Sequence, residues 1–151
     1  MVKNHKEVLA ATHQKLIEFN ELNKLHGPEL AWEKMLEGLP EKQKKRMATF
    51  LAEPTLFKAF TRAIPFFESA GMEMEIVDLS NKGSDAVLEI QKYCPYLQIC
   101  KEYNIETPCH IICDIEIEST RQAFPEMKGE ILARQAFGSC VCLFKYERPA
   151  K

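Results

Sequence analysis

The hydrophobic period of this chain changes at Gly71, and this change limits the folds that the chain can adopt. Before Gly71 the apolar residues recur at spacings of three, four and seven, which is typical of the buried face of a helix. Residues 72–77, MEMEIV, instead alternate Met or Ile with Glu or Val, as in a strand with one buried face. A helical half followed by alternating strands predicts an α+β fold.

The N-terminal part, residues 1–70, is expected to form four helices. Glycine and proline separate them, at Gly27-Pro28 and at Gly38-Leu39-Pro40. Pro54 suits the first turn of the fourth helix, and Pro65 inside that helix should kink or divide it. We expect these helices at residues 5–24, 29–37 and 41–52 and from residue 54 onward.

The second part, residues 71–147, is expected to form an antiparallel sheet of about four strands with the motif helix inserted between its second and third strands. Thr107-Pro108 is typical of an N-cap and a first-turn proline, and it should start a helix that runs to about residue 123. A shorter helix is expected at residues 96–103. The expected strands are residues 72–79, 86–93, 128–137 and 140–146, the last two joined by a tight turn at Gly138-Ser139.

Length and charge limit the class of protein. A chain of 151 residues with 46% hydrophobic and 28% charged residues fits one domain, residues 1–151, because no linker divides it. No stretch approaches the roughly 18 to 20 apolar residues of a membrane helix, and the first residues lack the apolar run of a signal peptide. The net charge of −2, without a basic stripe, gives no support for nucleic acid as a partner. We therefore expect a cytoplasmic protein that binds a small molecule; its oligomeric state stays open, a homodimer included.

Two stretches of the helical part can be explained either by a structural role or by a binding role. The run KQKKR at residues 42–46 predicts a solvated helix face, and an anionic partner is the alternative. Phe57, Phe60 and Phe67 recur at helical spacing, which favours core packing over a cofactor site.

Six cysteines are the strongest candidates for chemistry. Four lie within residues 94–113, and Cys140 and Cys142 follow in the expected last strand. Cys109 and Cys113 are four residues apart and should share one helix face. Cys94 is expected at a strand-to-helix junction, where unpaired backbone N–H groups favour a thiolate. The pattern predicts a thiol-lined pocket, although buried cysteines acting as small hydrophobic residues are the alternative.

Acid–base groups follow the cysteines on the same helix. Glu116 lies three residues after Cys113 and seven after Cys109, so it is the best placed carboxylate for proton transfer or water activation. His110 is turned about 100° away from Cys109 and is better directed toward Cys94 or a substrate.

The motifs of this region resemble those of the L-2-amino-thiazoline-4-carboxylic acid hydrolase-like family. The resemblance covers residues 93–146 and rests on C-P-Y, K-E-Y-N-I, C-H-I-I-C, an acidic helix, a strand containing an arginine and a closing C-x-F-x-Y. The family's recurring positions correspond to Cys94, Pro95, Cys109, Cys113, Arg134 and Cys142, whereas Cys100 and Cys140 fall outside them.

The resemblance implies hydrolytic opening of a cyclic C–N bond, which gives a carbamoylated cysteine. Cys94 or Cys109 would then be the nucleophile or a metal ligand, and Glu116 or His110 would transfer protons. Arg134 would bind the substrate carboxylate, because a guanidinium grips a carboxylate through two hydrogen bonds.

A binding module without enzymatic activity is the alternative. Cys94, Cys109, Cys113 and Cys142 would then hold zinc, an iron–sulfur cluster or a tetrapyrrole-type ligand. The spacing gives this reading little support, because the sequence contains no C-x-x-C pair of the kind found in zinc ribbons. A third reading makes the helical part a scaffold for a protein partner, which would require an exposed apolar patch.

Overall fold

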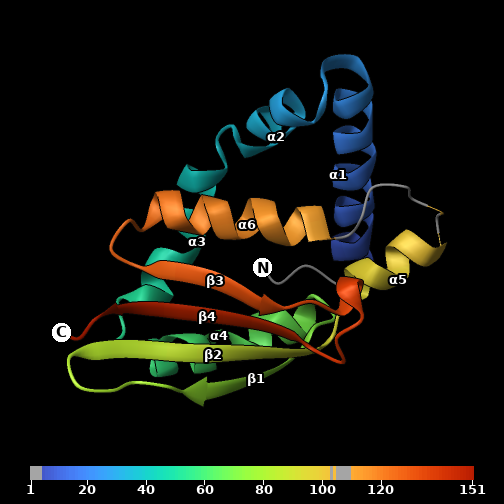
Figure 1. Cartoon of the computed structure of the whole chain (residues 1–151). Coiled ribbons are helices and arrows are strands. Elements are labelled where there is room, and N and C mark those ends of the chain that lie inside the picture. The colour runs from blue at the N-terminus through green and yellow to red at the C-terminus, as the bar shows by residue number, and fades with distance from the viewer. Residues whose placement is uncertain (1–4, 103, 105–109) are drawn as a thin grey trace.

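The computed structural model describes residues 5–102, 104 and 110–151. Helices fill the N-terminal part, and a four-stranded sheet follows them, so the predicted α+β fold is confirmed (Figure 1). The four helices are α1 (His5–His26), α2 (Pro28–Leu36), α3 (Leu39–Leu51) and α4 (Leu56–Ser69). None of the helices that the structure describes is long and apolar enough to cross a membrane.

The helix boundaries follow the glycines, the prolines and one capping residue. Gly27 and Gly38 adopt positive φ angles of 84° and 75° just before α2 and α3, and both helices carry proline in the first two positions. Thr55 caps α4, because its side chain accepts a hydrogen bond of 3.2 Å from the backbone N–H of Lys58. The expected start at Pro54 is therefore wrong, and α4 continues through Pro65 without being divided.

The sheet is antiparallel throughout, with the order β1-β2-β4-β3. Its strands are β1 (Glu73–Asp78), β2 (Ser84–Tyr93), β3 (Lys128–Ala133) and β4 (Cys142–Pro149). Two helices, α5 (Pro95–Glu102) and α6 (His110–Ala123), lie between β2 and β3 in the chain, where the motif helix was expected. The expected helix start at Thr107-Pro108 lies outside the described residues.

The connection between β3 and β4 is longer than predicted. Strand β3 ends at Ala133, and Gln135–Phe137 form a short 3₁₀ helix, η1, that ends at Gly138 with φ 96°. The side chain of Gln135 donates hydrogen bonds to the backbone oxygens of Lys92, at 2.9 Å, and Cys140, at 3.0 Å. These bonds hold the segment as a turn, so the predicted strand to residue 137 and the tight turn are wrong.

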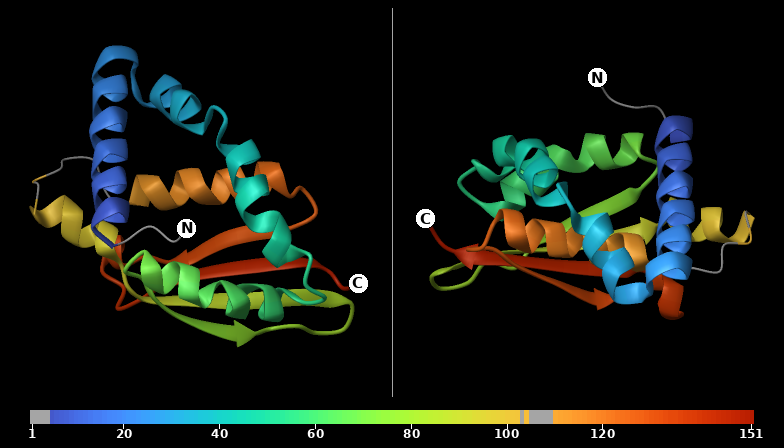
Figure 2. Two further views of the ribbon diagram at one scale, coloured as in Figure 1. Left: turned by 180° about the vertical axis from the view of Figure 1, so that it is seen from behind. Right: turned by 90° about the horizontal axis from the view of Figure 1, so that it is seen from above.

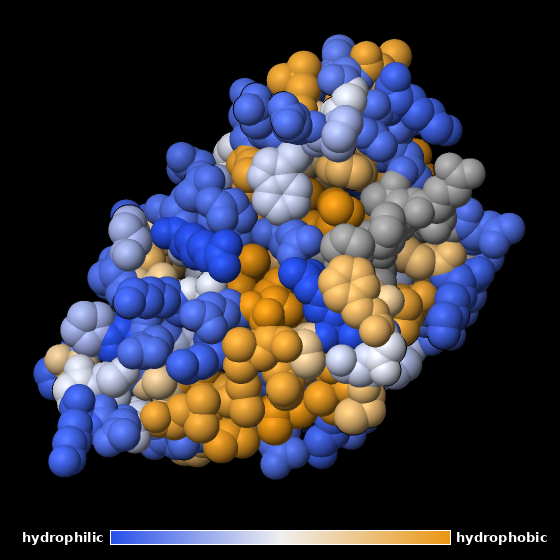
Figure 3. All heavy atoms as spheres, in the orientation of Figure 1, coloured by the Kyte–Doolittle hydropathy of each residue, from blue (hydrophilic) through white to orange (hydrophobic). Residues whose placement is uncertain are grey.

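Helices cover one face of the sheet and leave the other open. Helix α4 packs on β1 and β2, α6 packs on β3, and α3 contacts both helices (Figure 2). Half-buried or exposed apolar side chains of the open face include Leu88, Ile90, Leu132 and Leu143. In the view of Figure 3, apolar atoms gather over the region of the strands. The covered face is therefore the one that can enclose a site.

A buried ion pair joins the sheet to the ends of two helices. Nε of Arg148 in β4 lies 2.7 Å from Oδ2 of Asp85 in β2. Asp85 also accepts hydrogen bonds from the backbone N–H of Leu56 at the start of α4, and Arg148 donates to the backbone oxygens of Leu51 and Glu53. The pair thus satisfies unpaired backbone groups at the end of α3 and the start of α4.

Candidate functional site

A pocket of about 100 Å³ lies between the covered face of the sheet and helices α3, α4 and α6. We call it the aromatic pocket, because rings and methionines form most of its wall. These side chains come from both halves of the chain: Phe50, Phe60, Phe66, Phe67, Tyr96, Phe144, Tyr146, Met47, Met72 and Met74. Phe60 stacks on Tyr146 with the ring centroids 4.8 Å apart.

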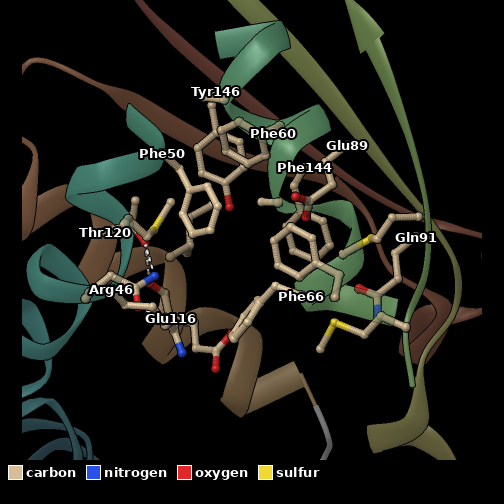
Figure 4. A pocket seen from close by; sticks show the side chains of 18 of the residues that line it. Arg46, Phe50, Phe60, Phe66, Glu89, Gln91, Glu116, Thr120, Phe144 and Tyr146 are labelled. Atoms are coloured by element: carbon tan, nitrogen blue, oxygen red, sulfur yellow. Dashed lines mark hydrogen bonds between the residues drawn. The ribbon is translucent and has the colours of Figure 1, made fainter. Parts of the chain in front are cut away.

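Polar groups enter the aromatic pocket from opposite sides. Figure 4 shows Glu89 and Tyr146 on one side, and Arg46 and Glu116 on the other. Gln91 of β2 and Thr120 of α6 also line the pocket. A small number of convergent polar groups in an apolar cavity is typical of a small-molecule site.

Glu89 is the most perturbed of these groups. Its side chain belongs to a residue that is 5% exposed, and Oε2 has no hydrogen-bond partner among the described residues. Burial first, and the charge of Glu116 second, raise the pKa of Glu89 to about 8. The carboxyl is therefore mostly protonated at neutral pH, so it can donate a proton or a hydrogen bond to a ligand.

The two tyrosines in the wall stay neutral as well. Burial is the main cause that raises the pKa of Tyr96 and of Tyr146, and Glu116 or Glu89 adds to it. The hydroxyl of Tyr146 points toward the interior of the pocket (Figure 4). A ligand in the pocket would thus meet neutral hydrogen-bonding groups on the side of the sheet.

Arg46 is held at the pocket by a chain of hydrogen bonds. Its Nη2 donates to Oε1 of Gln43, whose Nε2 donates to Oγ1 of Thr120 at 2.8 Å, the dashed line in Figure 4. Thr120 in turn donates to the backbone oxygen of Glu116 at 3.0 Å. The guanidinium also lies 5.9 Å from the ring centroid of Phe66. Helices α3, α4 and α6 therefore fix the position of this cation together.

Three of the predicted cysteines meet at a different and smaller cavity. Cys94, Cys113 and Cys142 line a space of about 10 Å³ together with Arg134, and we call it the cysteine cavity. Sγ of Cys142 accepts a hydrogen bond of 3.2 Å from the backbone N–H of Gln135. A space of this size holds about one water molecule, so it has no room for a substrate ring.

The described residues of the cysteine cavity give no support to the predicted zinc ion, iron–sulfur cluster or tetrapyrrole-type ligand. Within residues 5–102, 104 and 110–151, no group of three or more His, Cys, Asp or Glu is arranged to hold a metal ion. Apolar side chains such as Leu97, Ile131 and Phe144 form the rest of the wall. Cys109, the fourth predicted ligand, lies outside the described residues, as does the side chain of His110.

The other predicted residues divide between the two cavities. Glu116, which the sequence placed near the face of Cys109 and Cys113, lines the aromatic pocket and not the cysteine cavity. Arg134 lines the cysteine cavity, forms an ion pair with Asp114 and lies 5.5 Å from the ring centroid of Phe137. Cys113 lines both cavities, so the two are neighbours on the covered side of the sheet.

Comparison with known proteins identifies the family. The family model described as L-2-amino-thiazoline-4-carboxylic acid hydrolase matches residues 5–146, nearly the whole chain. The chain belongs to this family. The resemblance inferred from the cysteine motifs is thereby confirmed, and the match extends well beyond the last third of the sequence.

The chain was also compared with curated proteins and with solved structures. No curated protein matches this hydrolase-family chain. Among solved structures, it is similar to the phenol-responsive sensory domain of the transcription activator PoxR, crystallised with phenol. The TM-score is 0.55 at 11% identity, and the alignment covers 99% of this chain and 76% of that one. A likeness at this identity shows a shared fold.

Sequence reasoning missed several groups of the pocket in this family member. Glu89 and Gln91 alternate with Leu88 and Ile90, and in an isolated strand the apolar pair is the natural candidate for the core. The structure reverses the faces, because Val87, Glu89 and Gln91 are buried under the helices. Arg46 belongs to the KQKKR run, whose lysines and arginine are exposed as predicted, and its place at the rim of the pocket was not foreseen. The only available signal was that the run is amphipathic within α3.

Proposed function

We propose that the aromatic pocket binds a small cyclic molecule and hydrolyses a C–N bond of its ring. The observation that carries the proposal is the buried carboxyl of Glu89, protonated at neutral pH, which lines the same pocket as Glu116. Two acids whose environments differ are a common basis for acid–base catalysis. The family name supplies the substrate class, a cyclic isothiourea that carries a carboxylate.

The size of the aromatic pocket supports a ligand with a single ring. Its volume of about 100 Å³ is comparable with the roughly 150 Å³ apolar cavity that accepts one benzene molecule in another protein. The aromatic rings of Phe50, Phe60 and Phe144 in its lining suit contact with a planar ring. The pocket is thus matched to a five- or six-membered ring rather than to a fused cofactor.

Proton transfer at this site can be assigned to the two acids. Glu116 accepts a proton from a water molecule as its oxygen attacks the ring carbon between nitrogen and sulfur. Glu89 donates its proton to the ring nitrogen as the C–N bond breaks. The water oxygen remains on the carbon as a carbonyl, both hydrogens of the water end on the released nitrogen, and the two acids return to their starting states. One water is consumed, and the product is a carbamoylated cysteine.

The cysteines have a supporting place in this proposal. Of the predicted ligands and nucleophiles that the structure describes, Cys113 lines both cavities, so its side chain would form part of the wall around a bound ring. Attack by Cys94 or Cys109 stays a prediction from the sequence. No step passes through a metal, because the described cysteines do not form a site that fits one.

Replacement of Glu89 tests the proposal. Turnover of 2-amino-thiazoline-4-carboxylate by Glu89→Gln is expected to fall about 100-fold or more at pH 7, since a positioned acid contributes roughly 10² to 10⁴. The activity of the unmodified protein should fall as pH rises past about 8, where Glu89 loses its proton. Glu130→Gln, on the open face of β3, is the matched control and should keep full turnover. Equal turnover in both variants would remove Glu89 from the reaction.

A receptor function without catalysis is the second candidate. It is favoured by the fold shared with a sensory domain whose structure contains phenol, and by the neutral hydroxyl of Tyr146 inside a mainly aromatic wall. Titration calorimetry with phenol and with the thiazoline, alongside the turnover assay, separates the two. Binding of either ligand without release of product would favour the receptor.

A further inference from the structure

A second cavity adjoins the aromatic pocket on the side of the N-terminal helices. It has a volume of about 370 Å³ and lies among α1, α2, α3 and α6. We call it the polar chamber, because charged side chains form much of its wall. Gln43, Arg46 and Glu116 line both spaces, so the polar chamber begins where the aromatic pocket ends.

Four cations surround the polar chamber: Lys15, Lys34, Lys42 and Arg46. None of them forms an ion pair in the part of the chain that the structure describes. Three acids, Glu18, Glu37 and Glu116, also line the space, which leaves positive charge in excess by one. An anion that enters the chamber would therefore meet cations that no carboxylate already neutralises.

A buried hydroxyl in the wall lacks a partner. Ser119 of α6 is 2% exposed, and its Oγ makes no hydrogen bond to any residue that the structure describes. It lines the polar chamber together with Ile112 and Ile115. An unsatisfied buried hydroxyl is unfavourable, and an oxygen of a ligand in the chamber would satisfy it.

Arg46 stands at the junction of the two spaces in a fixed orientation. Gln43 accepts one of its hydrogen bonds, and Phe66 lies beside the guanidinium. The remaining N–H groups are available to a ligand, and the planar guanidinium matches a carboxylate in geometry. Arg134, by contrast, is already paired with Asp114 at the cysteine cavity.

We infer that the polar chamber is the subsite for a carboxylate-bearing substituent of the ligand, with Arg46 as its clamp and Ser119 as a further donor. This inference rests on the proposed function, because the ring must occupy the aromatic pocket for its substituent to reach the chamber. It assigns to Arg46 the role that sequence reasoning gave to Arg134. The larger volume of the chamber extends the substrate class to rings with acidic side chains longer than a single carboxyl group.

A pair of probes that resist ring opening tests the inference. Calorimetry on the full chain compares 2-aminothiazole-4-carboxylate with 2-aminothiazole, which lacks the carboxylate. We expect the unmodified protein to prefer the carboxylate by about 10-fold or more, as a charge-assisted hydrogen bond provides. Arg46→Gln should reduce this ratio to near one. Ser119→Ala should reduce it by a smaller factor, about threefold.

Matched controls separate the clamp from a general loss of charge. Arg62→Gln removes an arginine that stacks on Phe50, as Arg46 does on Phe66, but lines neither cavity, so the ratio should persist. Arg134→Gln should also keep it. A ratio that survives in Arg46→Gln, or disappears only in Arg134→Gln, would overturn the inference.

The outcomes also separate this inference from the proposed function. Equal binding of both probes by the unmodified protein overturns the carboxylate subsite, while the turnover assay on Glu89→Gln still stands. Binding of neither probe overturns both. A ratio that falls equally in Arg46→Gln and in Arg62→Gln would point to the net charge of the protein, and this result also contradicts the assigned clamp.

Discussion

Two carboxyl groups on the covered face of β2 have opposite surroundings. Asp85 and Glu89 lie four residues apart on the same side of one strand, and both are buried, at 3% and 5% exposure. Asp85 contacts Arg148 and accepts two hydrogen bonds from the backbone N–H of Leu56, at 2.9 and 3.0 Å. Glu89 has an oxygen without a partner in the described chain and faces a cavity.

The difference separates a structural group from a functional one. When a buried charge has a complete set of partners, these offset much of the free energy that its burial costs. The charge then fixes the elements that surround it, here the end of α3 and the start of α4. A buried carboxyl oxygen without a partner is unfavourable for the folded state. Such a group persists where a ligand supplies the missing partner, and this is the physical reason to place the site at Glu89.

The largest effect should come from breaking the satisfied pair. Arg148→Gln leaves the buried Asp85 without its cation and frees the backbone oxygens of Leu51 and Glu53. We expect a loss of about 3 to 5 kcal/mol in the free energy of unfolding, measured by urea denaturation. Arg62→Gln, which removes an exposed pair with Glu53, should lose at most about 1 kcal/mol. Similar losses in the two variants would contradict the structural role of Asp85.

A smaller effect should appear in the dependence of stability on pH. The pKa of Glu89 is about 8 in the folded protein and near 4.5 in the unfolded chain. The folded state therefore retains a proton that the unfolded state releases, so the contribution of Glu89 to stability is highest below about pH 4.5 and decreases until about pH 8. Between pH 5 and pH 8 the unmodified protein should lose about 2 to 4 kcal/mol more than Glu89→Gln, which does not titrate.

Urea denaturation of both proteins at the two pH values measures this difference, and the other titrating groups cancel in the comparison. A parallel decrease in the two proteins would show that Glu89 is not protonated in the folded state. Added ligand should reduce the difference if it hydrogen-bonds to the carboxyl of Glu89, because the unpartnered oxygen is then satisfied.

The sequence predicts the class of this fold well, because periodicity depends on local geometry. The change at Gly71 separates helices from strands correctly, and β4 buries Cys142, Phe144 and Tyr146 on one side as the alternation indicates. The end of β3 was not predictable in the same way. It depends on the contacts of Gln135 with Lys92 and Cys140, which are distant or irregular in sequence.

The site was harder to predict than the fold. The family motifs singled out Cys94, Cys113 and Cys142, which line one cavity, but no sequence pattern reports the size of that cavity. Glu89 was missed because the helices, and not the strand, decide which face of β2 is buried. Arg46 was missed for a different reason, since it is exposed like the lysines of its run, and only tertiary contacts of α3 with α6 and Phe66 bring it to the edge of the pocket.

The smallest effect is expected at an exposed carboxyl group, which can be compared with the buried Asp85 and Glu89. Glu147 of β4 points to the open face, and a hydrogen bond of 2.8 Å from Oγ of Ser84 is the main cause that lowers its pKa. Ser84→Ala should therefore raise the pKa of Glu147 toward its ordinary value, as followed by NMR titration. The urea midpoint should stay unchanged and Glu89 should titrate as before, because water replaces the lost hydrogen bond at a solvated site. A measurable loss of stability in Ser84→Ala would mean that burial is not what distinguishes Asp85 and Glu89 from the other acids of the sheet.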